Sequence, residues 1–557
     1  MRKFLLCVLC FALCCLFAAA IPARKGVHRL EDRNGNIIEA ELVGDEYGHC
    51  FKTSDGYIVE EREDGFYEKS DVRFDAVELD IRRQKLKKAK GVENDRRTFA
   101  SSHAQKGLVI LVSFSDVAFS KTKSSFYNML NQYGYSDNGA TGSAKDYFSA
   151  MSYATYSPTF DVYGPYTLPK NQMYYGQDIG GSEGSDAHPD QMVVDAVAKL
   201  VADKGSSVLS QYDCDGDGYV DNVFVFYAGF AQSEGASSNT IWPHRWKVFS
   251  RNVDGQVTYN GVTISDYACS SELLYTSGST MTAIGSFCHE FSHVLGLVDL
   301  YDTGGSYSFN TPNSWDLMDM GCYNNDMRTP AAYSAYERFV VGWMQPVVIT
   351  GTGHFELNEV NKSTQCAYLI SPNGWHNMDG ANPNPAEFYM LENRQKSGWD
   401  AALPGSGMLL WKIKYNAANW AGNTVNANKN NQGVDLIEAG GDVKESGYYV
   451  SSSSDAYPGS KKVTSCTTYP RYNVVNIVEK GGKISFDIQG KAADAACVQD
   501  DVKVIRLSDG ECIVSGLVEG QTVMVFDAAG RLIFERQAEG ETMTFQYDNG
   551  IYFVKVR

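Results

Sequence analysis

Two histidines and one glutamate stand at a spacing that suits zinc chemistry. The stretch 287–301 contains His289, Glu290 and His293. Residues four apart share one face of a helix, so both imidazoles can bind one Zn²⁺ at about 2.0–2.1 Å. Glu290 can accept a proton from a zinc-bound water as that water attacks a carbonyl, and can pass it to the leaving amine. The motif therefore predicts a zinc hydrolase.

A third zinc ligand is expected shortly after this helix. Gly296 can adopt a positive φ and end the helix, so that the chain turns back and brings Asp299 to the same ion. Glu337 is the alternative, because some zinc peptidases take a glutamate from a later helix. Spacing favours Asp299 but leaves both open.

Three further residues are candidates for roles around the zinc. Met318 follows the site in a predicted turn, where it forms either a thioether floor beneath the ligands or part of the ordinary core. Tyr323 is the nearest phenol able to donate to a tetrahedral oxyanion. Cys50, upstream, is a candidate fourth ligand that would keep a precursor inactive.

A second group of acidic residues resembles half of a calcium-binding loop. Asp213, Asp215 and Asp217 alternate before a glycine, and Asp221 follows four residues later. Phe224 stands where an EF-hand needs its bidentate glutamate, so a complete EF-hand is excluded. Two interpretations remain: a structural Ca²⁺ site made by the four aspartates, or an Asp/Gly-rich turn that binds its own backbone.

The elements that must position these residues alternate between strands and helices. Continuous apolar runs at 108–114 and 223–227 predict strands buried on both faces, and helical spacing is found at 192–201 and around 283–297. Short strands follow residue 347, and more follow residue 496. We expect an α+β catalytic domain over 105–345, a β-rich accessory domain over 346–492, and a small β-sandwich over 499–557.

The N-terminal residues indicate the compartment of the protein, and the net charge limits its expected partners. Residues 1–20 have the pattern of a secretory signal peptide that ends at three alanines, and no later stretch predicts a transmembrane helix. Residues 21–104 are expected to be a pro-region, with a basic connector over 82–97 and a possible cleavage after Arg97. The chain has 49 basic and 67 acidic residues, so nucleic acid is not an expected partner.

The zinc motif and several shorter stretches resemble the immune inhibitor A-type secreted metallopeptidases. The similar stretches are 142–148, 158–162, 227–229, 241–244, 299–302 and 341–343. The resemblance implies a zincin-like fold, with a metzincin-like motif in which an aspartate replaces the third histidine. Residues 44–46 and 53–57 are similar to the pro-region of that family. Met320 stands where metzincins usually have a tyrosine, which leaves the oxyanion role of Tyr323 open.

The last residues resemble a different family of domains. The stretches 525–531 and 550–552 are similar to the sorting domain of type IX secretion, which implies passage through the periplasm to the cell surface or medium. Together these features predict a secreted zinc endopeptidase that is made as a zymogen and acts on proteins. Two alternatives are a non-catalytic, calcium-stabilised surface adhesin on a zincin scaffold and a zinc amidase that acts on cell-wall material.

Overall fold

The computed structural model divides the chain into two units, 1–490 and 491–557. The residues that it describes are 19–76, 105–179, 185–248, 257–305, 308–445, 448–467, 469, 471–490, 504–508, 511–515, 517–527, 532–546 and 552–556. The predicted signal sequence up to residue 18 and the predicted basic connector therefore lie outside the described residues.

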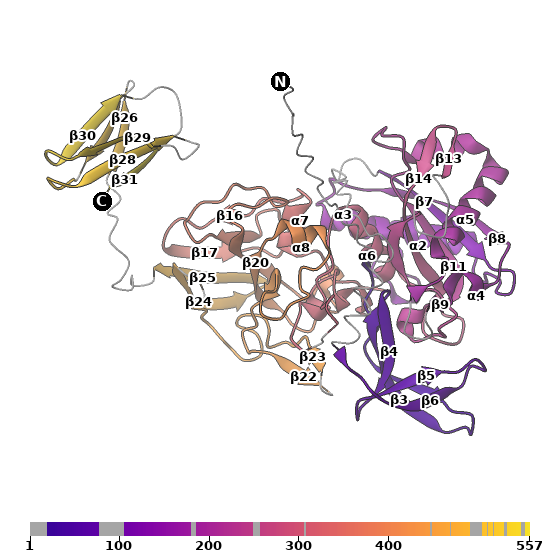
Figure 1. Ribbon diagram of the computed structural model, residues 1–557. Helices are drawn as coiled ribbons and strands as arrows, with labels where there is room; N and C mark the ends of the chain where they lie inside the picture. The colour runs from indigo at the N-terminus through magenta and orange to yellow at the C-terminus, as the bar shows by residue number, and fades with distance from the viewer. Residues whose placement is uncertain are drawn as a thin grey trace, which may run out of the picture. The chain divides into compact units, whose positions relative to one another are not determined.

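A six-stranded sheet forms the centre of the first unit (Figure 1). Its order is β1 (Ala19–Ala20), β12 (His244–Lys247), β15 (Asp266–Leu273), β11 (Val223–Phe230), β7 (Lys106–Ser113) and β8 (Thr159–Thr167). The last four of these strands are parallel, whereas β12 is antiparallel to β15 and β1 is antiparallel to β12. The N-terminal residues thus extend the antiparallel edge of the sheet.

Both faces of this sheet are buried, as the apolar runs predict. In β7, Val109 and Leu111 belong to one core cluster, and Leu108, Ile110 and Val112 to another. Helix α5 (Pro189–Lys204) packs on the second face, and α2 (Lys123–Asn131), α3 (Ala144–Met151) and α6 (Ile284–Val294) on the first. Alternate side chains on a strand point to opposite faces, so a continuous apolar run fills two cores.

The region after residue 346 contributes to the same core. A five-stranded sheet has the order β16 (Val347–Val348), β18 (Ala367–Ile370), β19 (Glu387–Arg394), β20 (Gly407–Lys414) and β21 (Val434–Leu436). Met390 and Trp411 on one face join the core that holds α6, whereas Leu391 and Leu410 pack against a three-stranded sheet. That sheet contains β17 (Gly353–Leu357), β25 (Lys483–Gly490) and β24 (Tyr472–Lys480). The boundary predicted near residue 345 therefore lies inside one packed unit.

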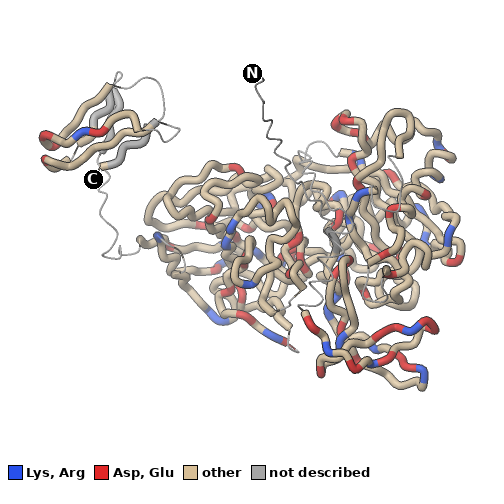
Figure 2. Tube along the Cα trace, viewed as in Figure 1, with Lys and Arg blue, Asp and Glu red and all other residues tan. Residues whose placement is uncertain are grey.

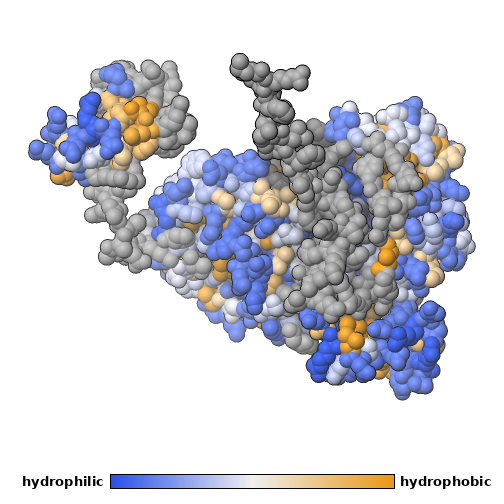
Figure 3. Space-filling view, viewed as in Figure 1, coloured by the Kyte–Doolittle hydropathy of each residue, from blue (hydrophilic) through white to orange (hydrophobic). Residues whose placement is uncertain are grey.

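A five-stranded antiparallel meander forms the N-terminal region. It comprises β2 (Val27–Glu31), β3 (Ile37–Asp45), β4 (Gly48–Thr53), β5 (Tyr57–Glu61) and β6 (Tyr67–Arg73). Charged residues are dense along its outer strands (Figure 2), and its surface in Figure 3 is mostly hydrophilic with small apolar areas. The turn between β3 and β4 is buried, and His49 stacks on Trp242, which lies just before β12, with ring centroids 4.6 Å apart. This turn anchors the meander next to β12.

The C-terminal unit contains two three-stranded antiparallel sheets. One has the order β26 (Val504–Ser508), β27 (Glu511–Ser515) and β30 (Thr542–Gln546), and the other β29 (Leu532–Gln537), β28 (Thr522–Asp527) and β31 (Tyr552–Val556). Val514, Val523 and Met543 are among the residues of its small core. This unit therefore consists of two sheets around one small core.

The remaining elements are short, and they connect the sheets described above. They are β9 (Asp178–Ile179), β10 (Ser185–Asp186), β13 (Val257–Tyr259), β14 (Val262–Ile264), β22 (Val443–Glu445), β23 (Tyr448–Val450), α4 (Gln172–Gly176), α7 (Ala335–Val340) and α8 (Ala417–Ala421). Among the described residues, no helix combines the length and the apolar composition needed to cross a membrane.

Candidate metal centre and active site

Helix α6 carries the two histidines and Glu290 into the interior. Every residue of this helix is buried. Phe287 and Phe291 lie four apart and pack on Phe160 of β8, with ring centroids 4.9 and 5.3 Å away. The aromatic face fixes the helix on the sheet, so His289 and His293 project together from another face.

A glycine ends the helix and redirects the chain. Gly296 has φ of +93°, and its N–H donates to the carbonyl of His293 at 3.0 Å. A side chain at that φ is strained, whereas glycine is not. Asp299 lies three residues farther on and is fully buried, and Leu300 N–H donates to the carbonyl of Met318 at 2.8 Å. This turn brings Asp299 back to the histidines, as the sequence predicts.

Three potential ligand atoms converge beside α6. His289 Nε2 lies 3.1 Å from Asp299 Oδ1, His293 Nε2 lies 3.3 Å from the same oxygen, and the two Nε2 atoms are 3.3 Å apart. The opposite ring nitrogens each lie 2.9 Å from a backbone carbonyl: His289 Nδ1 from Leu317 O and His293 Nδ1 from Leu297 O. In each neutral ring Nδ1 thus holds the proton, and Nε2 is an acceptor.

Such a set of acceptors fits a divalent cation. Burial lowers the pKa of His293, which favours the neutral imidazole that can act as a ligand. Burial works against ionisation of Asp299, but the adjacent His293 and His289 outweigh it and hold the pKa of Asp299 below its usual range. Two imidazoles that present Nε2 and one carboxylate are a donor set that zinc prefers in catalytic sites.

Asn423 supports the carboxylate from a distant part of the chain. Its Oδ1 accepts a hydrogen bond from the Asp299 N–H at 2.7 Å, and its Nδ2 donates to Asp299 Oδ2. The second carboxylate oxygen is therefore occupied, and Oδ1 is turned toward the histidines. Asn423 follows α8, 124 residues after Asp299, so the region predicted to be an accessory domain completes the candidate metal site.

Residues 96–345 match the family Immune inhibitor A peptidase M6, catalytic domain. This matched region is called the M6 domain below. The M6 domain contains α6, its turn and Asp299, but not Asn423. The match supports a metallopeptidase, and zinc is the metal that this family implies.

Two proteins with related sequences have names that agree with this assignment. The chain is 26% identical over 332 residues to "Pre-pro-metalloprotease PrtV" of Vibrio cholerae serotype O1, which covers 51% of this chain and 35% of that protein. It is 27% identical over 214 residues to "Immune inhibitor A" of Bacillus thuringiensis subsp. alesti, which covers 34% of this chain and 30% of that protein. The similarity thus spans about a third of each relative.

Glu290 lies next to the ligand cluster of the M6 domain, and part of the N-terminus contacts it. Burial, and next the charge of Asp299, raise the pKa of the Glu290 carboxyl well above its usual range. Glu290 Oε1 accepts a hydrogen bond from the backbone N–H of Ile21 at 2.9 Å, and Oε2 is buried with no hydrogen-bond partner in the described structure. The backbone of Ile21 therefore occupies one carboxylate oxygen of Glu290, the predicted catalytic base.

Residues 19–25, here called the N-terminal segment, run across the M6 domain in contact with its polar groups. Trp242 Nε1 donates to the Ile21 carbonyl at 2.9 Å, and Tyr323 OH donates to the Pro22 carbonyl at 2.8 Å. The phenol predicted to face an oxyanion is therefore bonded to the N-terminal segment. The oxyanion role of Tyr323 remains a prediction.

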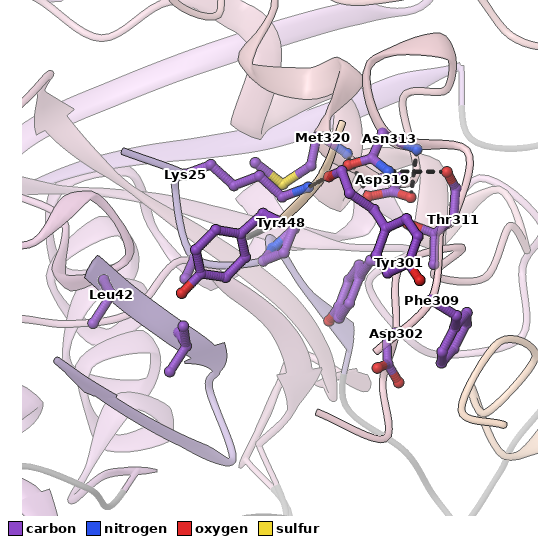
Figure 4. A pocket seen from close by; sticks show the side chains of 14 residues that line it. Lys25, Leu42, Tyr301, Asp302, Phe309, Thr311, Asn313, Asp319, Met320 and Tyr448 are labelled. Atoms are coloured by element: carbon purple, nitrogen blue, oxygen red, sulfur yellow. Dashed lines mark hydrogen bonds between the residues drawn. The ribbon is translucent and has the colours of Figure 1, made fainter. Parts of the chain in front are cut away.

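A cavity of about 50 Å³ lies beside this segment (Figure 4). Leu42 of the meander, Tyr301 of the M6 domain and Tyr448 of the region after it all line the cavity. Lys25 points into it toward Asn313 and Asp319, and its Nζ donates to Asn313 Oδ1 (Figure 4). The space is enough for water but not for a peptide, and residues 22, 23 and 25 of the N-terminal segment form part of its wall.

The remaining zinc-site candidates lie in other surroundings. Glu337 Oε2 accepts from Ser334 N–H at 2.8 Å in the capping box of α7, and Glu337 is outside the ligand cluster. Cys50 is buried with Val43 and Ile58 in the meander, which contradicts its role as a zinc ligand. Met318 is buried in the main core, where its carbonyl holds the Leu300 N–H.

The candidate calcium loop lies between η2 (Ser206–Tyr212) and β11. Ligand atoms of Asp213, Asp215 and Asp217 lie within 4.8 Å of one another, whereas Asp221 is not in this cluster. Oxygens of the three aspartates also accept hydrogen bonds from Gly218, Asp217 and Tyr219 N–H groups at 3.1, 3.1 and 2.9 Å respectively. The loop therefore satisfies much of its own backbone, and the two interpretations of the sequence both remain.

Proposed function

We propose that the chain is a secreted, zinc-dependent endopeptidase that is made as an inactive precursor and hydrolyses peptide bonds in proteins. The observation that carries this proposal is the convergence of His289, His293 and Asp299 beside the buried Glu290. The match to the M6 catalytic domain and the names of the relatives support the same activity.

The residues of the site have separate roles in this proposal. His289, His293 and Asp299 would hold the zinc, with Asn423 fixing the carboxylate. Zinc, when bound, supplies a Lewis acid that polarises the substrate carbonyl and lowers the pKa of water. Glu290 would take the proton from the attacking water and deliver it to the leaving amine. The nearby positive charge would lower the raised pKa of Glu290 and so keep the carboxylate ionised, as proton acceptance requires.

The edge strand β12 would bind the substrate backbone. It is antiparallel to Ala19–Ala20, with Ala20 opposite His244 and Ala19 opposite Arg245. An extended peptide can add to an exposed sheet edge through main-chain hydrogen bonds, so a protein substrate would take the place of the N-terminal segment. In this proposal the Ile21 nitrogen, which contacts Glu290, would mark the position of the leaving amine of a cleaved bond.

The same contact explains how the precursor would stay inactive. Signal cleavage after Ala20 would leave Ile21 as the new N-terminus, with its amino group against Glu290 and no peptide bond before it. The segment would then resemble the amine product of hydrolysis, which the enzyme cannot cut again. Removal of the N-terminal region, by cleavage in the basic connector or elsewhere, would open the cleft.

The decisive experiment compares two glutamate substitutions in the processed enzyme. Glu290→Gln should retain zinc, measured by elemental analysis, and lose casein hydrolysis by about 10³-fold or more, because proton transfer is lost. Glu337→Gln is the matched control, since Glu337 is also buried in the M6 domain but lies outside the cluster. It should retain both zinc and activity. Full activity in Glu290→Gln would overturn the mechanism.

Latency and substrate class are tested on the parent protein. The purified precursor should digest casein at less than about a hundredth of the rate of the processed form, because a buried segment blocks the base. Equal rates would contradict the zymogen proposal. Turnover of peptidoglycan without turnover of casein would favour the cell-wall amidase instead.

The C-terminal unit is proposed to direct secretion. Its two three-stranded sheets and the sorting-domain resemblance of 525–531 and 550–552 support export by a type IX system. Deletion of 499–557 should leave the protein in the periplasm, as measured by fractionation. Unchanged release into the medium would contradict this role. We also propose that Asp213, Asp215 and Asp217 bind a structural Ca²⁺.

A further inference from the structure

The side chain of Arg24 occupies an acidic pocket of the M6 domain. Its Nη1 lies 2.8 Å from Glu234 Oε2, and its Nη2 donates to Asp326 Oδ1. The guanidinium carbon also lies 5.1 Å from the ring centroid of Tyr275 and 5.9 Å from that of Tyr323. Two carboxylates and two aromatic faces are a combination that recognises a guanidinium.

All of these contacts come from the M6 domain. Glu234 ends η3 (Gln232–Glu234), which follows β11, and Tyr275 lies just beyond β15. Tyr323 and Asp326 follow the turn that contains Met318. The pocket therefore does not depend on the N-terminal segment for any of its walls, and its residues would remain when that segment leaves.

Glu234 is the buried carboxylate of the pocket, and Arg24 balances its negative charge. Its side chain is 1% exposed, and besides Arg24 it accepts a hydrogen bond from Tyr275 N–H at 2.9 Å. Asp326 is 38% exposed and also pairs with Arg328 at 3.1 Å. Among the described residues, Arg24 is the only cation paired with Glu234. A buried carboxylate without a cation is costly, so the pocket favours a positively charged occupant.

The backbone between Ile21 and Arg24 relates the acidic pocket to Glu290, the proposed base. Ile21 N–H contacts Glu290 at 2.9 Å, Tyr323 binds the Pro22 carbonyl at 2.8 Å, and Ser233 O accepts from Arg24 N–H at 2.8 Å. The backbone is thus held at three points between the base and the pocket. If Ile21 occupies the position of the leaving amine, Arg24 is the fourth residue after the cleaved bond.

We propose that Glu234, assisted by Asp326, Tyr275 and Tyr323, forms a substrate subsite that selects arginine at the fourth position after the cleaved bond. This inference rests on the proposed endopeptidase function, and it adds a substrate preference to that function. The N-terminal segment then blocks the enzyme by presenting the side chain that the subsite prefers. Lysine would bind less well, because an ammonium group cannot reach both carboxylates in the forked manner of a guanidinium.

The first test measures cleavage by the active form that is obtained by proteolysis of the full chain. Four quenched fluorescent peptides would differ only at the fourth position after the cleaved bond, with Arg, Lys, norleucine or Glu. The kcat/KM for Arg should exceed that for norleucine by about 10- to 100-fold, as expected for charge-assisted hydrogen bonds. Equal values for all four peptides would overturn the subsite.

Substitutions assign the preference to this pocket. Glu234→Gln keeps an oxygen for Tyr275 N–H and should reduce the Arg-to-norleucine ratio to about 2 or less, since the ionic contact is lost. Asp326→Asn, at a more exposed position, should reduce the ratio by a smaller factor. Asp203→Asn is the control. Asp203 is an exposed carboxylate on α5 that accepts a hydrogen bond from Tyr166 OH at 2.7 Å, and its substitution should leave the Arg-to-norleucine ratio at the parent value. An unchanged ratio in Glu234→Gln would overturn the assignment.

A binding measurement separates this inference from the proposed function. The peptide Ile-Pro-Ala-Arg reproduces residues 21–24, and calorimetry on the processed enzyme should give a Kd at least about 10-fold lower than for Ile-Pro-Ala-norleucine. Preferred binding of the arginine peptide without turnover of any substrate would support the subsite and overturn the peptidase function. Turnover of the fluorescent peptides with equal Kd values would keep the function and overturn the subsite.

Discussion

His289, His293 and Asp299 lie in the buried centre of the first unit, whereas Asp213, Asp215 and Asp217 lie on a partly exposed loop. In the buried cluster, the atoms that point away from the centre of the cluster are hydrogen-bonded to other parts of the chain. Backbone carbonyls accept from both Nδ1 atoms, and Asn423 donates to Asp299 Oδ2. In the loop, the aspartates accept hydrogen bonds from the loop's own N–H groups.

This difference explains why the two clusters are unequal candidates for binding a cation. The candidate ligands of the buried cluster are oriented without a metal, because their second partners come from three separate parts of the chain. The loop carboxylates are oriented by local turns that need no cation. A metal therefore has a large effect on the first grouping and a small effect on the second, and each prediction below tests this contrast.

The largest effect is expected when a ligand of the buried cluster is removed. His293→Ala leaves one imidazole and one carboxylate, which should lower bound zinc to about a tenth or less and reduce activity by at least about 10³-fold. Zinc is measured by elemental analysis after dialysis, and activity on casein. Asp215→Asn, in the loop, is the control and should keep both. Equal losses in the two variants would contradict the contrast.

The second effect concerns the residue that positions Asp299. Asn423→Ala removes both hydrogen bonds to Asp299, so zinc affinity should fall by about 10- to 100-fold while a metal-bound state can still form. Competition with a chromophoric chelator measures the affinity, and excess zinc should restore most of the activity. Asn416→Ala is a nearby control, because this residue caps α8 without contacting Asp299. An unchanged affinity in Asn423→Ala would show that the cluster needs no such support.

The local parts of the site were predictable from sequence, and the distant parts were not. Helix periodicity predicts that His289 and His293 share one face with Glu290 beside them. The glycine three residues after His293 predicts the turn to Asp299. Asn423, in contrast, stands 124 residues from its partner in an Asn-rich stretch where no spacing marks it. The contact of Ile21 with Glu290, 269 residues away, has no sequence signal either.

The fold shows the same limit. Apolar runs predicted the buried strands of the central sheet, but the boundary near residue 345 was predicted from a change in pattern that does not separate two cores. The runs 388–391 and 408–411 are apolar at every position, a sign of burial on both faces. That signal could have indicated that one face of the second sheet packs on the core that holds α6.

A smaller effect is expected from the glycines that shape the two groupings. Gly296→Ala and Gly218→Ala place a side chain at φ of +93° and +87° with no atom closer than 3.9 Å to the new Cβ. Each should cost about 1–2 kcal/mol of stability through backbone strain alone. Only Gly296→Ala should also weaken zinc binding, by several-fold, because its turn positions Asp299. Calorimetric unfolding and chelator competition measure the two quantities. Equal zinc affinities in both variants would contradict a positioning role for the Gly296 turn.

The smallest effect is expected from calcium at the aspartate loop. A weak extracellular site that is filled at ten times its Kd stabilises the folded state by about 1.4 kcal/mol, so millimolar Ca²⁺ should raise Tm by a few degrees. The double substitution Asp213→Asn and Asp215→Asn should abolish this rise, whereas Asp203→Asn, an exposed acidic position on α5, should keep it. The double variant should still fold without calcium, because the amide oxygens can accept the same N–H groups. A rise of the same size in the double variant would assign calcium to another place and leave the loop as a turn that needs no cation.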